Sequence, residues 1–432
     1  MNEMFFLKYL FRYCSLLEHM FYFGQTLWNA RDNTKCRRHG GKPSSFNGLF
    51  VRMYRRRSGD GRETSCLSSA SVEVAHLLGH GMERQAIVRS FDMDDLKFGV
   101  RNKRGDWAPS APLEVAPFWV WPPQALKVLG WLRGYLWPWN AFHMCTALLY
   151  WRFVIPDVET MKTLSWGWAL WLYAVNAAAI FLMYGAVELF YYVQRKQTTR
   201  FKYNAKFPSD NPSDVFWFKS QNIDNFLRSF FISIPLWTLV EVLLLWCFAT
   251  GRAHWLSWNE HPIYLVILTL VAPAIHEVHF FCIHRLIHTP FAYKWIHSIH
   301  HNSINPSPWS SLSMHPVEGF LYHAVAFWHL VIPSNPIVAL FQLHIAGFGA
   351  INGHIGFEKL ELTENAALDS HAYGHYLHHK YFEVNYGGEG LIPLDKWFGT
   401  WHDGTKEGDT RMHARFEKKR ARMNAGRTGA SA

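Results

Sequence analysis

Long apolar segments recur along the chain from about residue 130 onward. Each is long enough to cross the roughly 30 Å hydrocarbon core of a bilayer as a helix. They are residues 134–156, 166–193, 226–250 and 261–284. Because each segment is bounded by polar residues or proline, the pattern predicts an all-α, multi-pass membrane protein with about four spans.

Two shorter apolar segments follow, at 318–333 and 335–352, and Pro333 and Pro336 separate them. Each is short for a full crossing at 1.5 Å of rise per residue. Backbone inside the bilayer must satisfy its own hydrogen bonds, so we expect helices here. The pair therefore predicts a short membrane hairpin, tilted or re-entrant.

The charges between the apolar segments predict how the chain is oriented. Five basic residues and no acidic residue occupy 194–206, whereas the loops 157–165 and 251–260 are nearly balanced. Basic loops face the cytoplasm, so 194–225 is expected on that side. Counting the spans then brings the segments after residues 284 and 352 to the cytoplasmic face as well.

Composition supports a membrane protein and divides the chain into regions. Aromatic residues make up 17% of the chain and its net charge is +10, which suits anionic lipid surfaces better than nucleic acid. We expect no nucleic-acid partner. The predicted regions are a basic, partly disordered N-terminal region at 1–110, transmembrane helices at 130–260, a histidine-rich domain at 261–402 and a basic tail at 403–432.

Histidines three or four residues apart form three groups in the last third of the chain. On a helix such residues share a face, so their imidazoles point in one direction. The groups are His284 and His288; His297, His300 and His301; and His371, His375, His378 and His379. The spacing HxxHH occurs in both the second and the third group. We therefore expect the three groups to share a function and not to be unrelated structural histidines.

Neutral imidazole is the commonest metal ligand in proteins, and these groups hold more nitrogens than one ion can bind. Two metal ions with open coordination positions suit the binding and splitting of dioxygen. Imidazole also suits zinc, so a zinc-binding membrane protein, hydrolytic or structural, remains an alternative. The chain lacks the HExxH spacing of zinc proteases in this region.

The strings HRLIH (284–288), HSIHH (297–301) and HYLHH (375–379) resemble the histidine boxes of the fatty acid hydroxylase/sterol desaturase superfamily. The resemblance covers roughly residues 130–402. It includes MHPVEG around His315, the isolated His354, and the closing segments Asn385–Gly387 and Leu394–Thr400. Departures are Phe281-Cys282 before the first box and Ser298 within the second.

The resemblance implies two iron ions held by the box histidines, with His315, His354 and His371 as further ligand candidates. It also implies a cytoplasmic di-metal cap and a lipid substrate, a sterol or a fatty acyl chain, that is hydroxylated or desaturated with O2. Glu277 would either orient an imidazole or pair with Arg285. A non-catalytic, lipid-binding relative is a further alternative, but no box histidine is missing.

Electrons would come from NAD(P)H through a separate carrier such as cytochrome b5 or ferredoxin. Fused relatives carry a cytochrome b5 domain marked by HPGG, whereas His39-Gly40-Gly41 here lacks the proline. We expect the endoplasmic reticulum in a eukaryote and the inner membrane in a bacterium. His143, near the start of the first span, is expected at the membrane interface, and His276 is expected to line the site.

Overall fold

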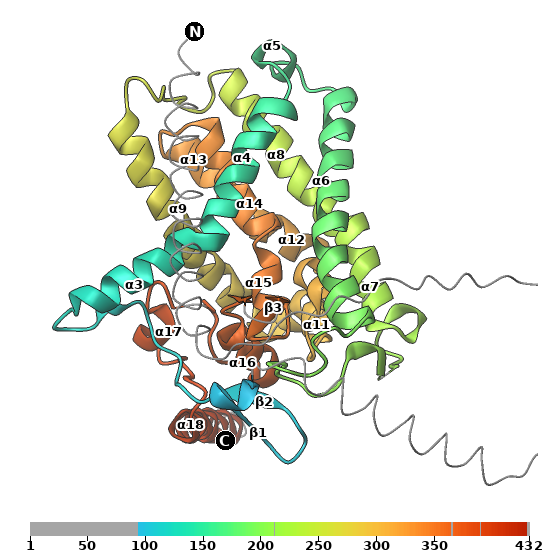
Figure 1. The fold of residues 1–432 in the computed structure, drawn as a ribbon, viewed down its shortest axis with the longest axis vertical. Helices are drawn as coiled ribbons and strands as arrows, with labels where there is room; N and C mark the ends of the chain where they lie inside the picture. Colours follow the sequence, from blue (N-terminus) through green and yellow to red (C-terminus); the bar gives the residue numbers. More distant parts are fainter. Residues whose placement is uncertain (1–93, 211, 364–365, 389, 430–432) are drawn as a thin grey trace, which may run out of the picture. The chain divides into compact units, whose positions relative to one another are not determined.

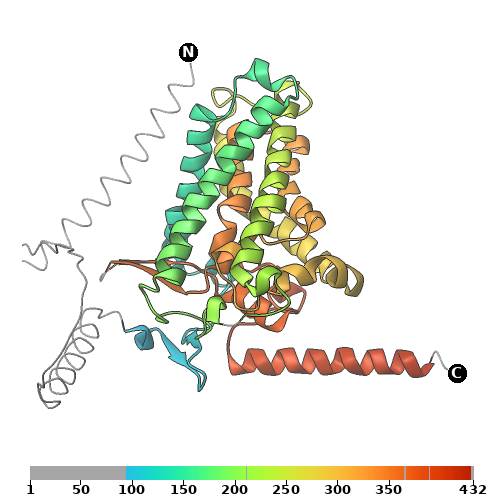
Figure 2. The ribbon, with the colours of Figure 1, turned by 90° about the vertical axis from the view of Figure 1, so that its right-hand side faces the viewer.

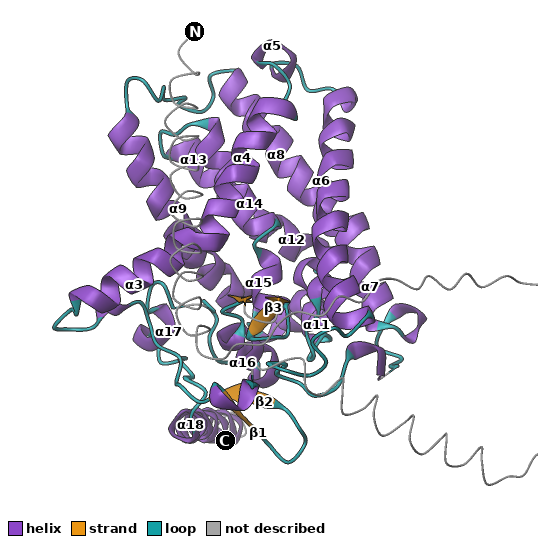
Figure 3. Ribbon diagram, viewed as in Figure 1, coloured by secondary structure: helices purple, strands orange, loops and turns teal. Residues whose placement is uncertain are grey.

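The computed structural model describes residues 94–210, 212–363, 366–388 and 390–429. Helices dominate this part of the chain, and the strands within it form two small sheets (Figure 3). The prediction of a mostly helical protein is confirmed. The expected partial disorder of the N-terminal region lies, up to residue 93, outside the described residues.

Among the described residues, four helices are long and apolar enough to cross a membrane. They are Trp166–Val193, made of α6 (Trp166–Val187) and a π-helical turn; Gln221–Ala249, made of α7 (Gln221–Arg228), a π-helical turn and α8 (Ile234–Ala249); α9 (Pro262–Ile287); and Pro336–His354, made of α14 (Pro336–Gly347) and α15 (Ala350–His354). The views in Figures 1 and 2 show α6 and α8 side by side.

The number of spans agrees with the sequence, but their identity differs at the first one. The predicted span 134–156 is interrupted, because α3 (Ala125–Tyr135) and α4 (Ala141–Phe153) meet at a kink. Trp137 has extended backbone angles (φ −132°, ψ 139°) there. A proline disfavours the helical conformation of the residue before it, and Pro138 directly follows Trp137. The helix α4 is consequently too short to be one of the four candidate spans.

The predicted hairpin also differs from what the structure shows. Its first half is divided among α12 (Pro316–His323), a 3-10 turn and α13 (Trp328–Val331). Its second half continues as far as His354 and is itself a candidate span, 78% of whose apolar window is buried inside the protein. A helix surrounded by α4, α8 and α9 needs less length and hydropathy than one exposed to lipid.

The contact between α8 and α14 shows how closely these helices pack. The indole of Trp237 lies so near Gly347 that a Cβ there would come within 2.6 Å of the ring. Trp237 itself is fully buried in the main hydrophobic core. Any larger residue at Gly347 would push the two helices apart, which would displace the chain leading to α15.

Most of the remaining elements lie at one end of the bundle, whereas α5 lies at the other end (Figure 1). Antiparallel strands β1 (Gly99–Arg101) and β2 (Trp107–Pro109) form one sheet, and β3 (Lys359–Thr363) and β4 (Ala366–Asp369) form the other, with Leu360 opposite Leu368. The other helices are α5 (Val158–Met161), α10 (Pro290–Ala292), α11 (Ser298–His301), α16 (Tyr373–Tyr381), α17 (Leu394–Trp397) and α18 (Lys406–Gly429).

Candidate metal centre

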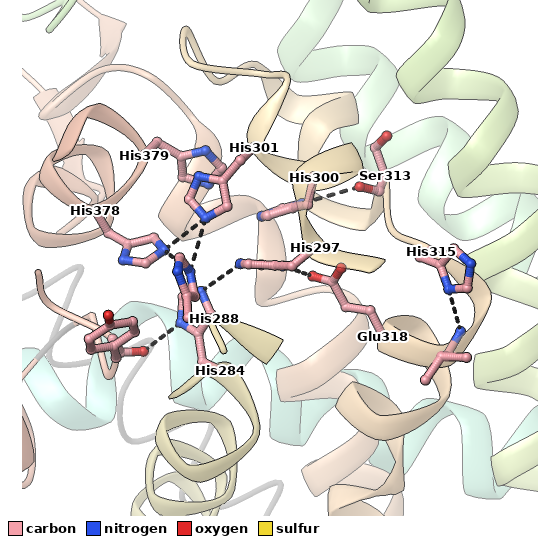
Figure 4. Close-up of polar contacts among 12 residues, drawn as sticks. His284, His288, His297, His300, His301, Ser313, His315, Glu318, His378 and His379 are labelled. Atoms are coloured by element: carbon pink, nitrogen blue, oxygen red, sulfur yellow. Dashed lines mark hydrogen bonds and ion pairs between the residues drawn. The ribbon is translucent and has the colours of Figure 1, made fainter. Parts of the chain in front are cut away.

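Nine of the predicted histidines converge in two groups at one end of the bundle, carried by the end of α9, the segment 293–301, α15 and α16. Within each group, one ligand nitrogen from every histidine lies within 4.8 Å of all the others. The five-histidine group consists of His284, His288, His297, His301 and His378, most of which are drawn in Figure 4. The four-histidine group consists of His300, His354, His375 and His379.

Each HxxHH segment contributes to both groups. Successive residues of a helix are turned by about 100°, so the first and fifth positions share a face while the fourth lies to one side. In the second box His297 and His301 join the five-histidine group and His300 joins the other. In the third box the first and fifth histidines, His375 and His379, join the four-histidine group, while His378 joins the five-histidine group. The spacing therefore serves two adjacent sites from one helix.

Hydrogen bonds at Nδ1 show that Nε2 of several of these rings faces the middle of its group. Nδ1 of His284 lies 2.7 Å from the carbonyl oxygen of Tyr386, and Nδ1 of His378 lies 2.7 Å from that of Val384. A carbonyl only accepts, so each Nδ1 carries the proton and each Nε2 presents a lone pair. Backbone carbonyl oxygens of Ser313 and Ala350 hold His300 and His354 in the same way.

The Nε2 atoms that face the middle of each group lie within hydrogen-bonding distance of one another. Nε2 of His378 is 3.0 Å from Nε2 of His301, and Nε2 of His354 is 3.1 Å from Nε2 of both His300 and His375. Since Nδ1 of both His300 and His354 is bound to a carbonyl, their Nε2 atoms present two lone pairs, which cannot form a hydrogen bond. Several lone pairs aimed at one point are what a metal cation requires. The residues present therefore fit two metal ions, one in each group.

Burial keeps these imidazoles in the form that binds metal. Burial, together with the neighbouring His284 and His300, lowers the pKa of His288 to about 2. Burial also lowers the pKa of His300 to about 4, although its hydrogen bond to Ser313 acts in the opposite direction. Because both pKa values lie far below neutrality, the rings are uncharged at pH 7 and their lone pairs are free.

Glu318, a residue that the sequence analysis does not single out, orients one of the rings. Its carboxylate oxygen lies 2.8 Å from Nδ1 of His297, and both side chains are buried (Figure 4). A carboxylate behind a ligating histidine fixes the ring and raises its basicity. The available signal was the sequence MHPVEG, in which Glu318 stands one helical turn after His315.

His315 and His371 lie outside both groups. Nδ1 of His315 accepts the backbone N–H of Val317 and so caps the start of α12, the helix that carries Glu318. His371 is exposed, has a left-handed backbone conformation (φ 58°) and lines the neighbouring cavity. Their predicted role as ligands stays a prediction, and their placement favours positions beside the centre.

Replacing either of these two histidines by alanine is expected to leave the metal content of the purified protein unchanged. His315→Ala removes a helix cap and should lower stability by about 1 kcal/mol. Elemental analysis together with thermal unfolding separates the two effects. A loss of metal in His371→Ala without loss of folded protein would instead make His371 a ligand.

Two buried carboxylates shape the loop that follows the third box. Glu277 accepts the backbone N–H groups of Gly390 and Ile392, at 3.1 and 3.0 Å. Asp395 accepts those of Tyr386 and Gly387, at 2.9 and 2.7 Å. Since the carbonyl of Tyr386 holds His284, the contacts of Asp395 position a ligand through the backbone. The predicted contact of Glu277 with an imidazole or with Arg285 stays untested.

A cavity of about 490 Å³ opens beside both groups. Ligand candidates from each group form part of its wall, including His284, His297, His300, His354 and His375. Much of the remaining wall is aromatic: Trp131, Tyr135, Trp139, Phe280 and Tyr322. A cavity with apolar and aromatic walls that leads to polar groups is typical of a site for an apolar ligand.

Parts of this chain are similar in sequence to known proteins. The family model "Fatty acid hydroxylase" matches residues 269–400. A Delta(7)-sterol 5(6)-desaturase of Gibberella zeae is 30% identical over 39% of this chain and 53% of its own length, and one of Aspergillus fumigatus is 26% identical over 52% and 72%. One of Saccharomyces cerevisiae is 34% identical over 24% and 28%. No solved structure matches the chain.

The apolar helices and the histidine-rich interior define a multi-pass membrane protein. The histidine-rich part of the chain, residues 269–400, matches the fatty acid hydroxylase/sterol desaturase superfamily. The family model covers both histidine groups, and the chain spans about half the length of the first of these relatives.

Proposed function

We propose that the protein is a membrane-bound di-iron oxidoreductase that uses O2 and an external electron donor to hydroxylate or desaturate a lipid. The observation that carries this proposal is the pair of histidine groups, which share helices and border one cavity with an apolar, partly aromatic wall. A structural zinc site needs four ligands and one ion, and nine converging imidazoles exceed that need. The proposed metal ligands are these nine histidines.

Iron ions bound by the two groups would supply the reduction of O2 and the removal of hydrogen from an unactivated C–H bond. The chain's own residues hold each ring in place. Backbone carbonyls keep the protons on Nδ1 of His284 and His378, and Glu318 accepts a hydrogen bond from Nδ1 of His297. The cavity wall excludes water from the lipid and places its chain beside the histidines.

The substrate that we propose is a sterol or a fatty acyl lipid. The relatives named above act on Delta(7)-sterols according to their names, which makes such sterols the first compounds to test. Electrons would pass from NAD(P)H through a separate carrier, cytochrome b5 or a ferredoxin. We assign the catalytic role to residues 261–402.

The test is a reconstituted reaction with purified protein in lipid nanodiscs. We expect close to two irons per chain, and O2-dependent conversion of a Delta(7)-sterol or a fatty acyl lipid when NADH, cytochrome b5 and its reductase are present. One zinc per chain, or iron without any O2 consumption over the panel of lipids, would overturn the proposal.

The histidine groups are proposed to face the cytoplasm, in the endoplasmic reticulum of a eukaryotic cell. Lys196 and Lys162 lie in exposed loops beyond opposite ends of the span Trp166–Val193, so they report opposite sides of the membrane. We expect Lys196→Cys to react with a membrane-impermeant maleimide in sealed microsomes, and Lys162→Cys to react only after detergent is added. The reverse labelling would contradict this orientation.

A further inference from the structure

Two histidines outside both groups and one asparagine line the cavity, and each has a side-chain atom without a hydrogen-bond partner among the described residues. They are His143 on α4, with both ring nitrogens unpaired; His276 on α9, with Nδ1 unpaired; and Asn352 on α15, with Oδ1 unpaired. His143 is 3% exposed and Asn352 is 7% exposed. The expectation that His143 lies at the membrane interface does not account for this burial within the protein.

Gly349 lies next to the ring of His143. A Cβ on Gly349 would come within 3.1 Å of Cε1 of His143, so the glycine keeps this end of the cavity accessible. Gly349 begins the short segment that leads to Asn352, which places the glycine, the histidine and the amide around one end of the cavity.

One face of α9 connects this polar end to the histidine groups. His276, Phe280 and His284 are four residues apart and all line the cavity. The rings of Phe280 and His284 have centroids 4.6 Å apart. His276 precedes His284 by two helical turns, or about 12 Å along the axis. The carbon skeleton of a single lipid molecule covers that distance.

Unpaired polar atoms in a buried site favour a ligand group that can both donate and accept. Asn352 Oδ1 accepts a hydrogen bond, and a neutral imidazole offers one donor and one acceptor. A hydroxyl group provides both functions. A buried polar group left without a partner loses free energy, so a ligand that supplies the missing partner gains affinity.

The charges of the wall argue against an anionic ligand. Among the residues that the structure describes, no lysine or arginine lines the cavity, while Glu114, Glu277 and Glu318 do. A carboxylate or phosphate headgroup would therefore enter without a cationic partner and close to fixed acidic groups. A neutral headgroup avoids that cost.

We propose that the cavity binds a neutral lipid bearing a free hydroxyl, which hydrogen-bonds with His143, His276 and Asn352 while its apolar skeleton extends towards the histidine groups. This inference rests on the proposed function, because it names the class of substrate that the same site would bind. The binding of the hydroxyl selects the lipid and sets which carbon faces the metal ligands.

The test measures binding of tritiated lipids to the full-length, iron-containing protein in nanodiscs. The probes are cholest-7-en-3β-ol against cholest-7-ene, and octadecanol against octadecanoate. We expect at least one hydroxylated probe to bind about tenfold more tightly than its partner without a free hydroxyl, as one added hydrogen bond in a buried site predicts. The sterol and the linear arm show which kind of alcohol the cavity accepts.

The variants His143→Phe and Asn352→Leu should each remove this preference, and His143→Gln, which keeps a donor and an acceptor, should retain part of it. His329→Phe is the matched control, because Nε2 of His329 is also buried and unpaired but does not line the cavity. Equal affinity of wild-type protein for both members of each pair, or tighter binding of octadecanoate, would overturn the inference. Iron content measured on the same samples keeps a failure of the proposed function distinct from a failure of hydroxyl binding.

Discussion

His300→Ala and His378→Ala should each lose at least half of the iron of the purified protein, and each should lower lipid oxidation by more than about 100-fold. His300 belongs to the four-histidine group and His378 to the five-histidine group. Both rings are buried and both Nε2 atoms lie about 3 Å from other ligand nitrogens. Removing either ring leaves a smaller ligand set and a void that water can enter.

Inductively coupled plasma spectrometry and a turnover assay on the same preparations measure both effects. His315→Ala is the control, because it removes an imidazole that lies beside the centre and outside both groups. Iron that stays at the wild-type value in both variants would show that neither group holds the metal. Size-exclusion chromatography of the same samples distinguishes loss of folded protein from loss of iron.

Replacing Glu318 by leucine should weaken iron binding by about 10- to 100-fold, the range found when a carboxylate behind a metal-binding histidine is removed. Leucine occupies similar space but accepts no hydrogen bond, so the ring of His297 loses its partner at Nδ1. Glu318→Gln keeps an acceptor without the charge and should fall between wild type and leucine. Competition with a chelator of known affinity measures the change.

Glu277→Gln is the matched substitution for Glu318→Gln. Both carboxylates are buried, but Glu277 accepts backbone N–H groups of Gly390 and Ile392. Losing the charge at Glu277 should lower the thermal midpoint by several degrees while iron affinity stays near that of wild type. Equal losses of iron affinity in the two glutamine variants would show that Glu318 contributes no more to iron binding than Glu277 does.

The sequence indicates the histidine centre well, because helical spacing places side chains on a common face. That rule predicts that His297 points together with both His300 and His301, whereas the structure places His300 in the other group. Helical spacing does not decide which of the two groups a ring joins. That depends on how α15, α16 and the end of α9 pack together. Glu318 was missed because an isolated glutamate after a histidine carries no periodic signal.

The membrane helices were predictable in number but not individually. Hydropathy alone treats 134–156 as one span, although the local preference of Trp137 before Pro138 breaks the helix. The segment that ends at His354 has modest mean hydropathy, 1.3, because other helices cover it in place of lipid. Such coverage is a property of packing and cannot be read from a single segment.

The alternation within each HxxHH segment ties the two halves of the centre to the same short pieces of backbone. On α16, His378 contributes to one half and His375 and His379 to the other, within five consecutive residues. An ion bound on one side would hold the helix still and lower the entropy lost when the second ion binds. Uptake of iron by the empty protein should therefore be cooperative, and chelation of one ion should loosen its neighbour.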